Sequence, residues 1–210
     1  MLNDSHIIIF TRFPVPGKTK TRLIPSLGPK RAAELQRNMT EKVAKEALIA
    51  AKNLAAPVSI FYTNGTEDEM RAWLGDFHYY PQVTGDIGVK MSQALRSTLK
   101  HDVSSAILVG SDIPGITAAI IENGIFSLKR SDVVLGPSVD GGYYLIGMNH
   151  NVAEKLDTLL FSNIPWSTGK VLTTTTDRLK KCNVSFSLLQ PLQDIDSPED
   201  ISFAKNMKLI

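Results

Sequence analysis

The sequence predicts an α/β protein with a mostly parallel central sheet flanked by helices, and three observations lead to this class. Short β-branched and apolar runs alternate along the chain with segments whose apolar residues recur at helical spacing. The chain of 210 residues, 43% of them hydrophobic, can bury one sizeable core. No repeat, low-complexity tract or long linker divides it. We therefore expect one domain over residues 1–210, with helical crossovers covering both faces of the sheet.

The expected strands are short runs rich in branched and aromatic residues. In chain order they are His6–Phe10, Pro57–Thr63, Ser105–Val109, Asp132–Leu135, Tyr143–Met148 and Val184–Leu189. The region Gly136–Trp166 is the least regular part of the chain, because glycines and an apolar-aromatic run interrupt any helical spacing. It favours a small antiparallel excursion over another strand–helix unit.

The expected helices fill the segments between these strands. Apolar residues recur every three or four positions in Pro29–Asn53, which predicts an amphipathic helix. Thr66–Glu69 has the pattern of a capping box, and Ser197–Asp200 combines a serine cap with a proline at the first helical position. Further helices are expected over Ile87–Leu99, Thr117–Leu128 and Thr168–Lys181.

Charge and cysteine content exclude several classes of protein. The formal net charge of +2 is too small for a nucleic-acid-binding domain. The single cysteine, Cys182, rules out an internal disulfide framework and fits a reducing compartment. The segment Met1–Ser5 lacks the positive start of a secretory signal, and no stretch reaches the roughly 18 apolar residues of a membrane span. We expect a cytoplasmic protein with neither nucleic acid nor a membrane as its partner.

The loop after the first strand ends in Gly17-Lys18-Thr19, which looks like the end of a phosphate-binding P-loop. A P-loop needs a glycine five residues before Gly17, because backbone N–H groups wrap the phosphates, and that position is Arg12. Pro14 and Pro16 have no N–H to donate. The P-loop interpretation therefore fails.

What remains is a stiff basic loop that carries Arg12, Lys18, Lys20 and Arg22. The guanidinium of Arg22 offers a planar fork and the ammonium of Lys20 a point charge, and both groups suit phosphate oxygens. The alternative is a solvated basic surface loop. The prolines before Gly17 favour binding, because they make the turn preorganised.

Two acidic positions follow predicted strands or turns. Asp112 comes directly after the buried run Ala106–Val109, and a carboxylate at the end of a strand suits a Mg²⁺ or Mn²⁺ ion that bridges phosphates. The alternative role for Asp112 is to cap the helix after Pro114. Asp140 precedes Gly141 and Gly142, which either form a hairpin turn or let the backbone approach a ligand closely.

Asp194 and Asp196 lie just before the last predicted helix. These acids either add a metal ligand or favour the positive N-terminus of that helix. Because ligands bind outside the carboxyl ends of strands in an open parallel sheet, we expect residues 11–22, Asp112 and Asp140 to converge on one cleft.

A family resemblance is carried by six stretches in order along the chain: FTRFPVPGKTKTRL, GDIGVKM, LVGSDIPGI, GPSVDGGYYLIGM, IPWSTGKVL and DIDSPED. Together they resemble a family of small bacterial glycosyltransferase-like proteins, formerly domain of unknown function 2064. That family belongs to the nucleotide-diphospho-sugar transferases, whose fold is called GT-A and is Rossmann-like, and is similar to phospholactate guanylyltransferase. The match runs from residue 7 to about residue 204.

The resemblance implies roles for particular residues. It places Asp112 where the metal-binding acid of an Asp-x-Asp motif stands, and Asp140, Gly141 and Gly142 in the donor and acceptor pocket. Gly110 replaces the first acid of a full motif, so Asp112 needs help from another carboxylate, such as Asp196, or from diphosphate oxygens. The residues that it turns towards the nucleotide and its phosphates are Arg12, Gly17, Lys20 and Arg22.

The predicted function is a metal-dependent transferase that binds a nucleotide-diphosphate donor, a nucleotide sugar, and passes the sugar to a small acceptor. In it Mg²⁺ or Mn²⁺ on Asp112 neutralises the leaving diphosphate, and Asp140 orients the acceptor or completes the metal shell. One alternative is a nucleotidyltransferase that joins a nucleoside triphosphate to a phosphorylated small molecule and releases diphosphate. A further alternative is a nucleotide-binding module without catalysis.

Overall fold

The fold is described from a computed structural model, which covers residues 5–100 and 103–210. Residues 1–4 lie outside these ranges, and they belong to the segment Met1–Ser5 on which the expectation of no secretory signal rests. The strands are β1 (Ser5–Arg12), β2 (Val58–Thr63), β3 (His78–Pro81), β4 (Ser105–Gly110), β5 (Val133–Pro137), β6 (Tyr143–Asn149) and β7 (Phe186–Leu188). All but β3 overlap the strands predicted from the sequence.

The strands form one seven-stranded sheet in the order β3-β2-β1-β4-β6-β5-β7. β6 runs antiparallel to its neighbours β4 and β5, and the other pairs are parallel. This confirms both the mostly parallel sheet and the antiparallel excursion predicted after Gly136. Because β6 is reversed, its first residues, Tyr143 and Tyr144, lie at the edge of the sheet where the parallel strands end.

The helices are α1 (Ile24–Leu54), α2 (Glu67–Leu74), α3 (Ile87–Thr98), α4 (Ala118–Ser127), α5 (His150–Phe161), α6 (Val171–Lys181) and α7 (Ile201–Asn206), with short 3-10 helices η1 (Thr21–Leu23) and η2 (Pro198–Asp200). Gly28, with a φ of 78°, interrupts α1, and the long regular part begins at Pro29 as predicted. The capping box at Thr66 is also present. The expectation of irregular chain up to Trp166 is wrong over α5. None of the helices in the described ranges combines the length and hydropathy of a membrane span.

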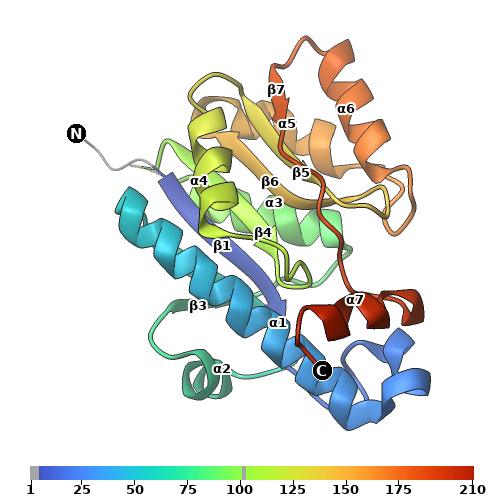
Figure 1. The fold of residues 1–210 in the computed structure, drawn as a ribbon. Coiled ribbons are helices and arrows are strands. Elements are labelled where there is room, and N and C mark those ends of the chain that lie inside the picture. The colour runs from blue at the N-terminus through green and yellow to red at the C-terminus, as the bar shows by residue number, and fades with distance from the viewer. Residues whose placement is uncertain (1–4, 101–102) are drawn as a thin grey trace.

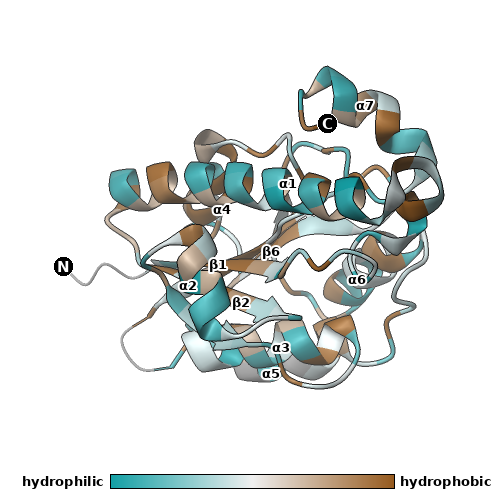
Figure 2. Ribbon diagram, turned by 90° about the horizontal axis from the view of Figure 1, so that it is seen from below, coloured by the Kyte–Doolittle hydropathy of each residue, from teal (hydrophilic) through white to brown (hydrophobic). Residues whose placement is uncertain are grey.

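Helices cover both faces of the sheet because alternate strand residues are apolar on both sides. In β1, Ile7 and Ile9 pack in a core with α1, α2 and α4. Ile8 and Phe10 point the other way, into a core with α3, α5 and α6. Figure 1 shows α1 and α4 lying across the sheet, and Figure 2 shows α3 and α5 on the opposite side.

A third apolar cluster joins the beginning of α1 to the C-terminal segment, which lies beside it in Figure 1. Leu23, Leu35 and Met39 pack there against Ile195 and Leu209. This packing brings the segment before η2 back to the carboxyl edge of the sheet, where the Ile195 amide donates a 3.1 Å hydrogen bond to the carbonyl of Asp112. Two acidic segments that are far apart in the sequence therefore meet at this edge.

Candidate functional site

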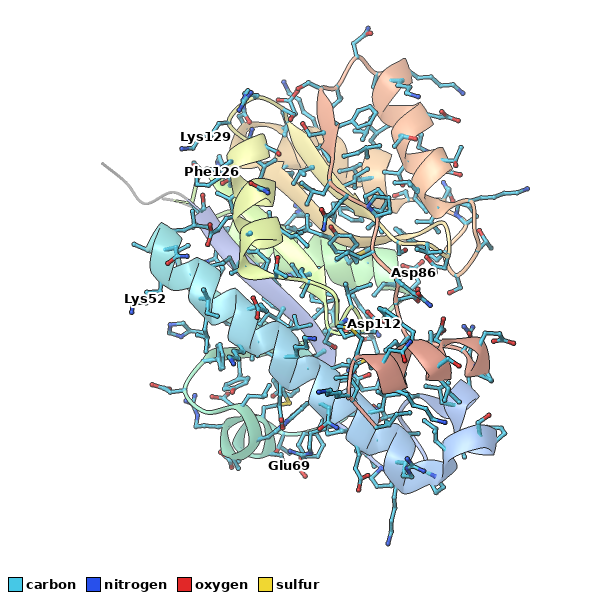
Figure 3. All side chains as sticks on the ribbon, in the orientation of Figure 1. Lys52, Glu69, Asp86, Asp112, Phe126 and Lys129 are labelled. Carbon is cyan, nitrogen blue, oxygen red and sulfur yellow. The ribbon has the colours of Figure 1, made fainter. Side chains whose placement is uncertain are left out.

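A cavity of about 520 Å³ opens at the carboxyl edge of the sheet. The ends of β1, β2 and β4, the start of β6, the basic loop after β1 and the segment before η2 all contribute to its wall. One part is polar and includes Gln36, Ser111 and Asp112, while another part is apolar and includes Met91 and Leu108. Figure 3 shows Asp112 at the end of the sheet that faces α7. The cavity lies where a parallel sheet binds its ligands.

The basic loop is held in one conformation by its own hydrogen bonds. The Thr19 hydroxyl is fully buried, accepts a 3.1 Å bond from the Val15 amide and donates to the Phe13 carbonyl. The following residue, Lys20, adopts a left-handed conformation with a φ of 48°, which costs a non-glycine residue about 1–2 kcal/mol. This strained backbone conformation places the Lys20 side chain beside Asp112 and Asp196.

The Lys20 ammonium lies between the two acids that the sequence selects as metal ligands. Its Nζ donates a 2.6 Å hydrogen bond to the Ile195 carbonyl and a 3.3 Å bond to Asp196 Oδ1. A 3.6 Å ion pair joins the same nitrogen to Asp112 Oδ2. The Lys20 side chain is only 6% exposed, whereas those of Asp112 and Asp196 are 44% and 40% exposed. One positive charge is thereby shared by two carboxylates at the cavity wall.

The two arginines of the loop are more open than Lys20. Arg22 Nη1 donates a 2.7 Å bond to Asp196 Oδ2, and its side chain is 68% exposed, so most of its five N–H donors remain for a ligand. Arg12 lines the cavity and is exposed, and its guanidinium forms no hydrogen bond or ion pair within residues 5–100 and 103–210. Both guanidinium groups are available to an anion.

A closed ring of buried hydrogen bonds supports the polar half of the cavity. Gln36 Nε2 donates to Thr40 Oγ1 at 3.0 Å and to Ser111 Oγ at 2.9 Å. Ser111 Oγ donates to Thr11 Oγ1 at 3.0 Å, and the hydroxyls of Thr11 and Thr40 are also 3.0 Å apart. These four side chains are almost completely buried. The ring ties β1, α1 and the residue before Asp112 together.

Asp140 occupies the turn between β5 and β6 and is largely used by that turn. Its Oδ1 accepts hydrogen bonds from the Ser138 hydroxyl and, at 2.9 Å, from the Gly142 amide. Gly141 has a φ of 90°, and a Cβ there would lie 2.4 Å from the Gly169 carbonyl oxygen. This turn therefore needs glycine for its own packing, whatever ligand role it has.

A third acid, Asp194, links the turn electrostatically to the cavity. Burial, followed by the negative charges of Asp140 and Asp112, raises the pKa of Asp194 to about 6, while Lys20 opposes the shift. Because Asp140 and Asp112 both raise the pKa of Asp194, the three carboxylates lie close enough to interact electrostatically. Negative charge is in excess there, which favours a bound cation.

The donor set at Asp112 and Asp196 fits a hard divalent cation. Both acids contact the same Lys20 nitrogen, so their geometry already lets one cation serve both. A Cβ at position 110 would lie 3.0 Å from Asp112 Oδ1, so Gly110 leaves room for that carboxylate. No group of three or more His, Cys, Asp or Glu side chains in the described ranges is arranged to hold a metal by itself. Ligand oxygens would have to complete the coordination.

Gln82, just after β3, was not selected from the sequence and lines the cavity. Its Nε2 donates to the carbonyls of Thr11 and Phe61, at 3.3 and 3.0 Å. Because carbonyl oxygens only accept, the amide nitrogen must face them, and the carboxamide oxygen is left as an acceptor. Gln36 was also missed.

The structure brings most of the predicted site residues together. The cavity wall includes five of them, which are Arg12, Lys20, Arg22, Asp112 and Asp196. Of the described residues that line it, none is Gly17, Asp140, Gly141 or Gly142. Gly17 has a φ of 81° and open space around its Cα, which is what the turn before Lys20 requires. The roles assigned to these residues remain predictions.

Comparison with solved structures shows which fold this is. A protein of Desulfovibrio desulfuricans G20, provisionally classed as a nucleotide-diphospho-sugar transferase, superposes with a TM-score of 0.84 at 28% identity, over 98% of this chain and 88% of its own. CMP:2-keto-3-deoxy-manno-octonic acid synthetase in complex with CTP gives 0.61 at 12% identity, over 98% of both chains. The Rv0371c protein of Mycobacterium tuberculosis H37Rv, in complex with manganese, gives 0.55 at 13% identity over 95% of this chain and 96% of its own. The chain has the nucleotide-diphospho-sugar transferase fold.

Sequence comparison identifies the family. No curated protein shows significant similarity to the chain. The family model described as "Uncharacterized protein conserved in bacteria (DUF2064)" matches residues 47–168, a range that contains Asp112 and Asp140. The resemblance found in the sequence motifs and the fold shared with the Desulfovibrio protein agree with this match. The chain therefore belongs to the DUF2064 family.

Proposed function

We propose that this protein is a metal-dependent transferase that binds a nucleotide-diphosphate donor in the cavity and transfers its sugar to a small acceptor. One observation carries the proposal: the acids Asp112 and Asp196 converge on a single cationic position, beside exposed guanidinium groups and at the carboxyl edge of the sheet. Acids for a divalent ion and arginines for phosphate are what a diphosphate needs.

The polar groups of the cavity wall divide into phosphate-binding, metal-binding and supporting residues. Arg22 and Arg12 bind the phosphate oxygens, since most of their donors remain for a ligand and point charges alone would not orient a diphosphate. Asp112 and Asp196 would hold Mg²⁺ or Mn²⁺, which supplies positive charge against the diphosphate that leaves. The Gln36 ring keeps the backbone before Asp112 fixed, so that this carboxylate is preorganised.

The apolar part of the cavity suits the base of the nucleotide. Phe10 and Met91 offer apolar contact surface, and the free oxygen of Gln82 would accept a hydrogen bond from an amino or imino group. Asp140, in the turn next to the acid cluster, remains the proposed acceptor-orienting residue. The Gly141–Gly142 turn fixes the Asp140 side chain, because the Gly142 amide donates a hydrogen bond to its carboxylate.

Nucleotidyl transfer is the second candidate, and the shared fold with a CTP-bound synthetase favours it. The same cation and arginines would then bind a nucleoside triphosphate, and diphosphate would be the product that leaves. The two reactions differ in what they release. Glycosyl transfer from a nucleotide sugar yields a nucleoside diphosphate, whereas nucleotidyl transfer yields inorganic diphosphate.

Calorimetry with nucleoside di- and triphosphates and nucleotide sugars, each with Mn²⁺ or with chelator, tests the binding step. For the best ligand, Arg22→Ala should weaken binding by about tenfold or more, because a charge-assisted hydrogen bond contributes roughly 1.5–3 kcal/mol. Lys18→Ala is the matched control, since Lys18 is exposed in the same loop. If the parent, Arg22→Ala and Lys18→Ala bind the ligand with equal affinity, the basic loop is a solvated surface loop and does not bind phosphate.

The catalytic step is tested by product analysis with the ligand so identified. Asp112→Asn keeps the size of the side chain and removes the charge that a hard cation needs. We expect it to lose most turnover while the metal-independent part of nucleotide binding survives. Detection of nucleoside diphosphate or of inorganic diphosphate selects between the two reactions. Full turnover of the parent in chelator would refute the metal assignment, and binding without any turnover would leave a nucleotide-binding module.

A further inference from the structure

Lys20 differs from the other cations of the loop in how completely it is engaged. Its Nζ donates to the Ile195 carbonyl and to Asp196, and it pairs with Asp112. An ammonium has three donors; the two hydrogen bonds use two of them, and Asp112 Oδ2 lies 3.6 Å away as an ion-pair partner. At 6% exposure the side chain has little access to solvent, and a buried cation is tolerated only with such partners.

The backbone shows that this placement is built into the loop. Lys20 takes the left-handed conformation that L-residues avoid, immediately after the buried Thr19 that anchors the loop. Arg22, two residues later, keeps most of its donors free and is 68% exposed. A phosphate-gripping role, expected from the sequence for both residues, fits Arg22 in this state and does not fit Lys20.

The acids explain what the Lys20 ammonium does instead. Asp112 comes from the end of β4, and Asp196 comes from the segment before η2. Without a cation between them, their like charges and that of Asp194 would repel one another. Lys20 lies where it offsets this repulsion, and the Ile195 carbonyl holds it there.

We propose that Lys20 is a built-in counter-ion for the acid pair, which positions Asp112 and Asp196 and competes with the divalent cation for them. This rests on the metal site of the proposed function. A divalent ion held by both acids would displace the Lys20 ammonium, which lies in the cavity wall and would then be available to phosphate oxygens. Nucleotide and metal binding would be coupled through this one side chain.

The competition predicts an increase in metal affinity on removing a cation. Binding of Mn²⁺ alone, without nucleotide, should be on the order of tenfold tighter in Lys20→Met than in the parent, since one positive charge no longer opposes the ion. Lys18→Met removes the same charge from the same loop without touching the acids and should change the affinity little. Free Mn²⁺ measured by electron paramagnetic resonance gives both constants, and thermal unfolding shows that the variants are folded.

An unchanged or weaker Mn²⁺ affinity in Lys20→Met would overturn the proposal, and so would an equal gain in Lys18→Met. Absence of Mn²⁺ binding in every form would overturn it as well. If binding of nucleotide is intact in the parent while Lys20→Met leaves Mn²⁺ affinity unchanged, the counter-ion role fails and the nucleotide site stands. Loss of nucleotide binding in the parent would instead refute the proposed function.

The parent protein provides a second test that needs no variant. Amine-reactive labelling, followed by mass spectrometry that resolves each lysine, should find Lys20 protected relative to Lys18 in chelator. Addition of Mg²⁺ should raise the labelling rate of Lys20 and leave that of Lys18 unchanged. A Lys20 that labels as fast as Lys18 in chelator, or that ignores Mg²⁺, contradicts the competition.

Discussion

Replacing Gln36 by leucine is the sharpest test of the hydrogen-bonded ring beneath the candidate site. The substitution keeps a side chain of similar size and removes two hydrogen bonds, to Thr40 at 3.0 Å and to Ser111 at 2.9 Å. Each bond contributes about 0.5–1.5 kcal/mol, and an acceptor left buried without a donor costs about 1–3 kcal/mol. The two hydroxyls keep their bonds to Thr11, so the full penalty does not apply. We expect the free energy of unfolding to fall by about 2–3 kcal/mol.

Urea unfolding, with an unchanged dependence on denaturant, measures this loss. Gln93→Leu is the matched control, because Gln93 is exposed on α3 and the same substitution there should stay within about 0.5 kcal/mol. A double-mutant cycle with Ser111→Ala should give a coupling of about 0.5–3 kcal/mol between positions 36 and 111. If Gln36→Leu is as stable as Gln93→Leu, or if the cycle is additive, the ring does not hold the site.

Three further predictions concern the framework. Gly141→Ala should lower the free energy of unfolding by about 3 kcal/mol or more, because its Cβ would meet the Gly169 carbonyl. Gly17→Ala is the control: only its positive φ opposes the substitution, so the free energy of unfolding should fall by about 1 kcal/mol. Equal losses in denaturant unfolding would show that the close contact at Gly141 does not matter. Burial, and then the charge of His78, lower the pKa of His6 from 6.5 to about 4, so the unfolded chain binds the extra proton in this window and stability falls as pH falls through it. His6→Gln should therefore remove about 2–3 kcal/mol of acid destabilisation between pH 6.5 and 4, and a parallel pH profile would contradict the shift. Thr66→Ala removes the N-cap of α2 and should lower the free energy of unfolding by about 1 kcal/mol, as measured by thermal unfolding. If the stability does not change, the cap is not formed in solution.

The sheet was predictable because most of its strands are buried on both faces and read as continuous apolar runs. β3 escaped detection: it is a four-residue edge strand that ends in Pro81, and only Tyr79 of its residues is buried. An edge strand tolerates proline and polar residues, so its sequence looks like a loop. Helix α5 escaped because the glycine-rich turn before it suggested that the irregular region continued.

The candidate site was predictable where a motif follows a strand and not where it depends on packing between elements. Asp112 and Arg22 could be placed at one edge because parallel strands end at the same edge. Gln36 lies inside a helix, where a lone polar residue normally indicates a solvated face, and nothing local reveals its partners on β1 and after β4. Gln82 follows the strand that was missed. The engagement of Lys20 with both acids depends on the return of the C-terminal segment, which no spacing in the sequence encodes.

The contact between Lys20 and Asp196 joins residues 176 positions apart, so it also bears on the order in which the protein folds. Closing so long a loop is entropically costly, and such contacts form after the local ones that shorten the effective path between them. We expect the basic loop and the first half of α1 to form before the C-terminal segment docks on them. During that interval Lys20 and Arg22 lack Asp196, and the apolar side of α1 at Leu35 and Met39 lacks its cover. We therefore expect that a state lacking the docked C-terminal segment would present positive charge next to bare apolar surface and would adhere to anionic chaperone or membrane surfaces more than the native protein does.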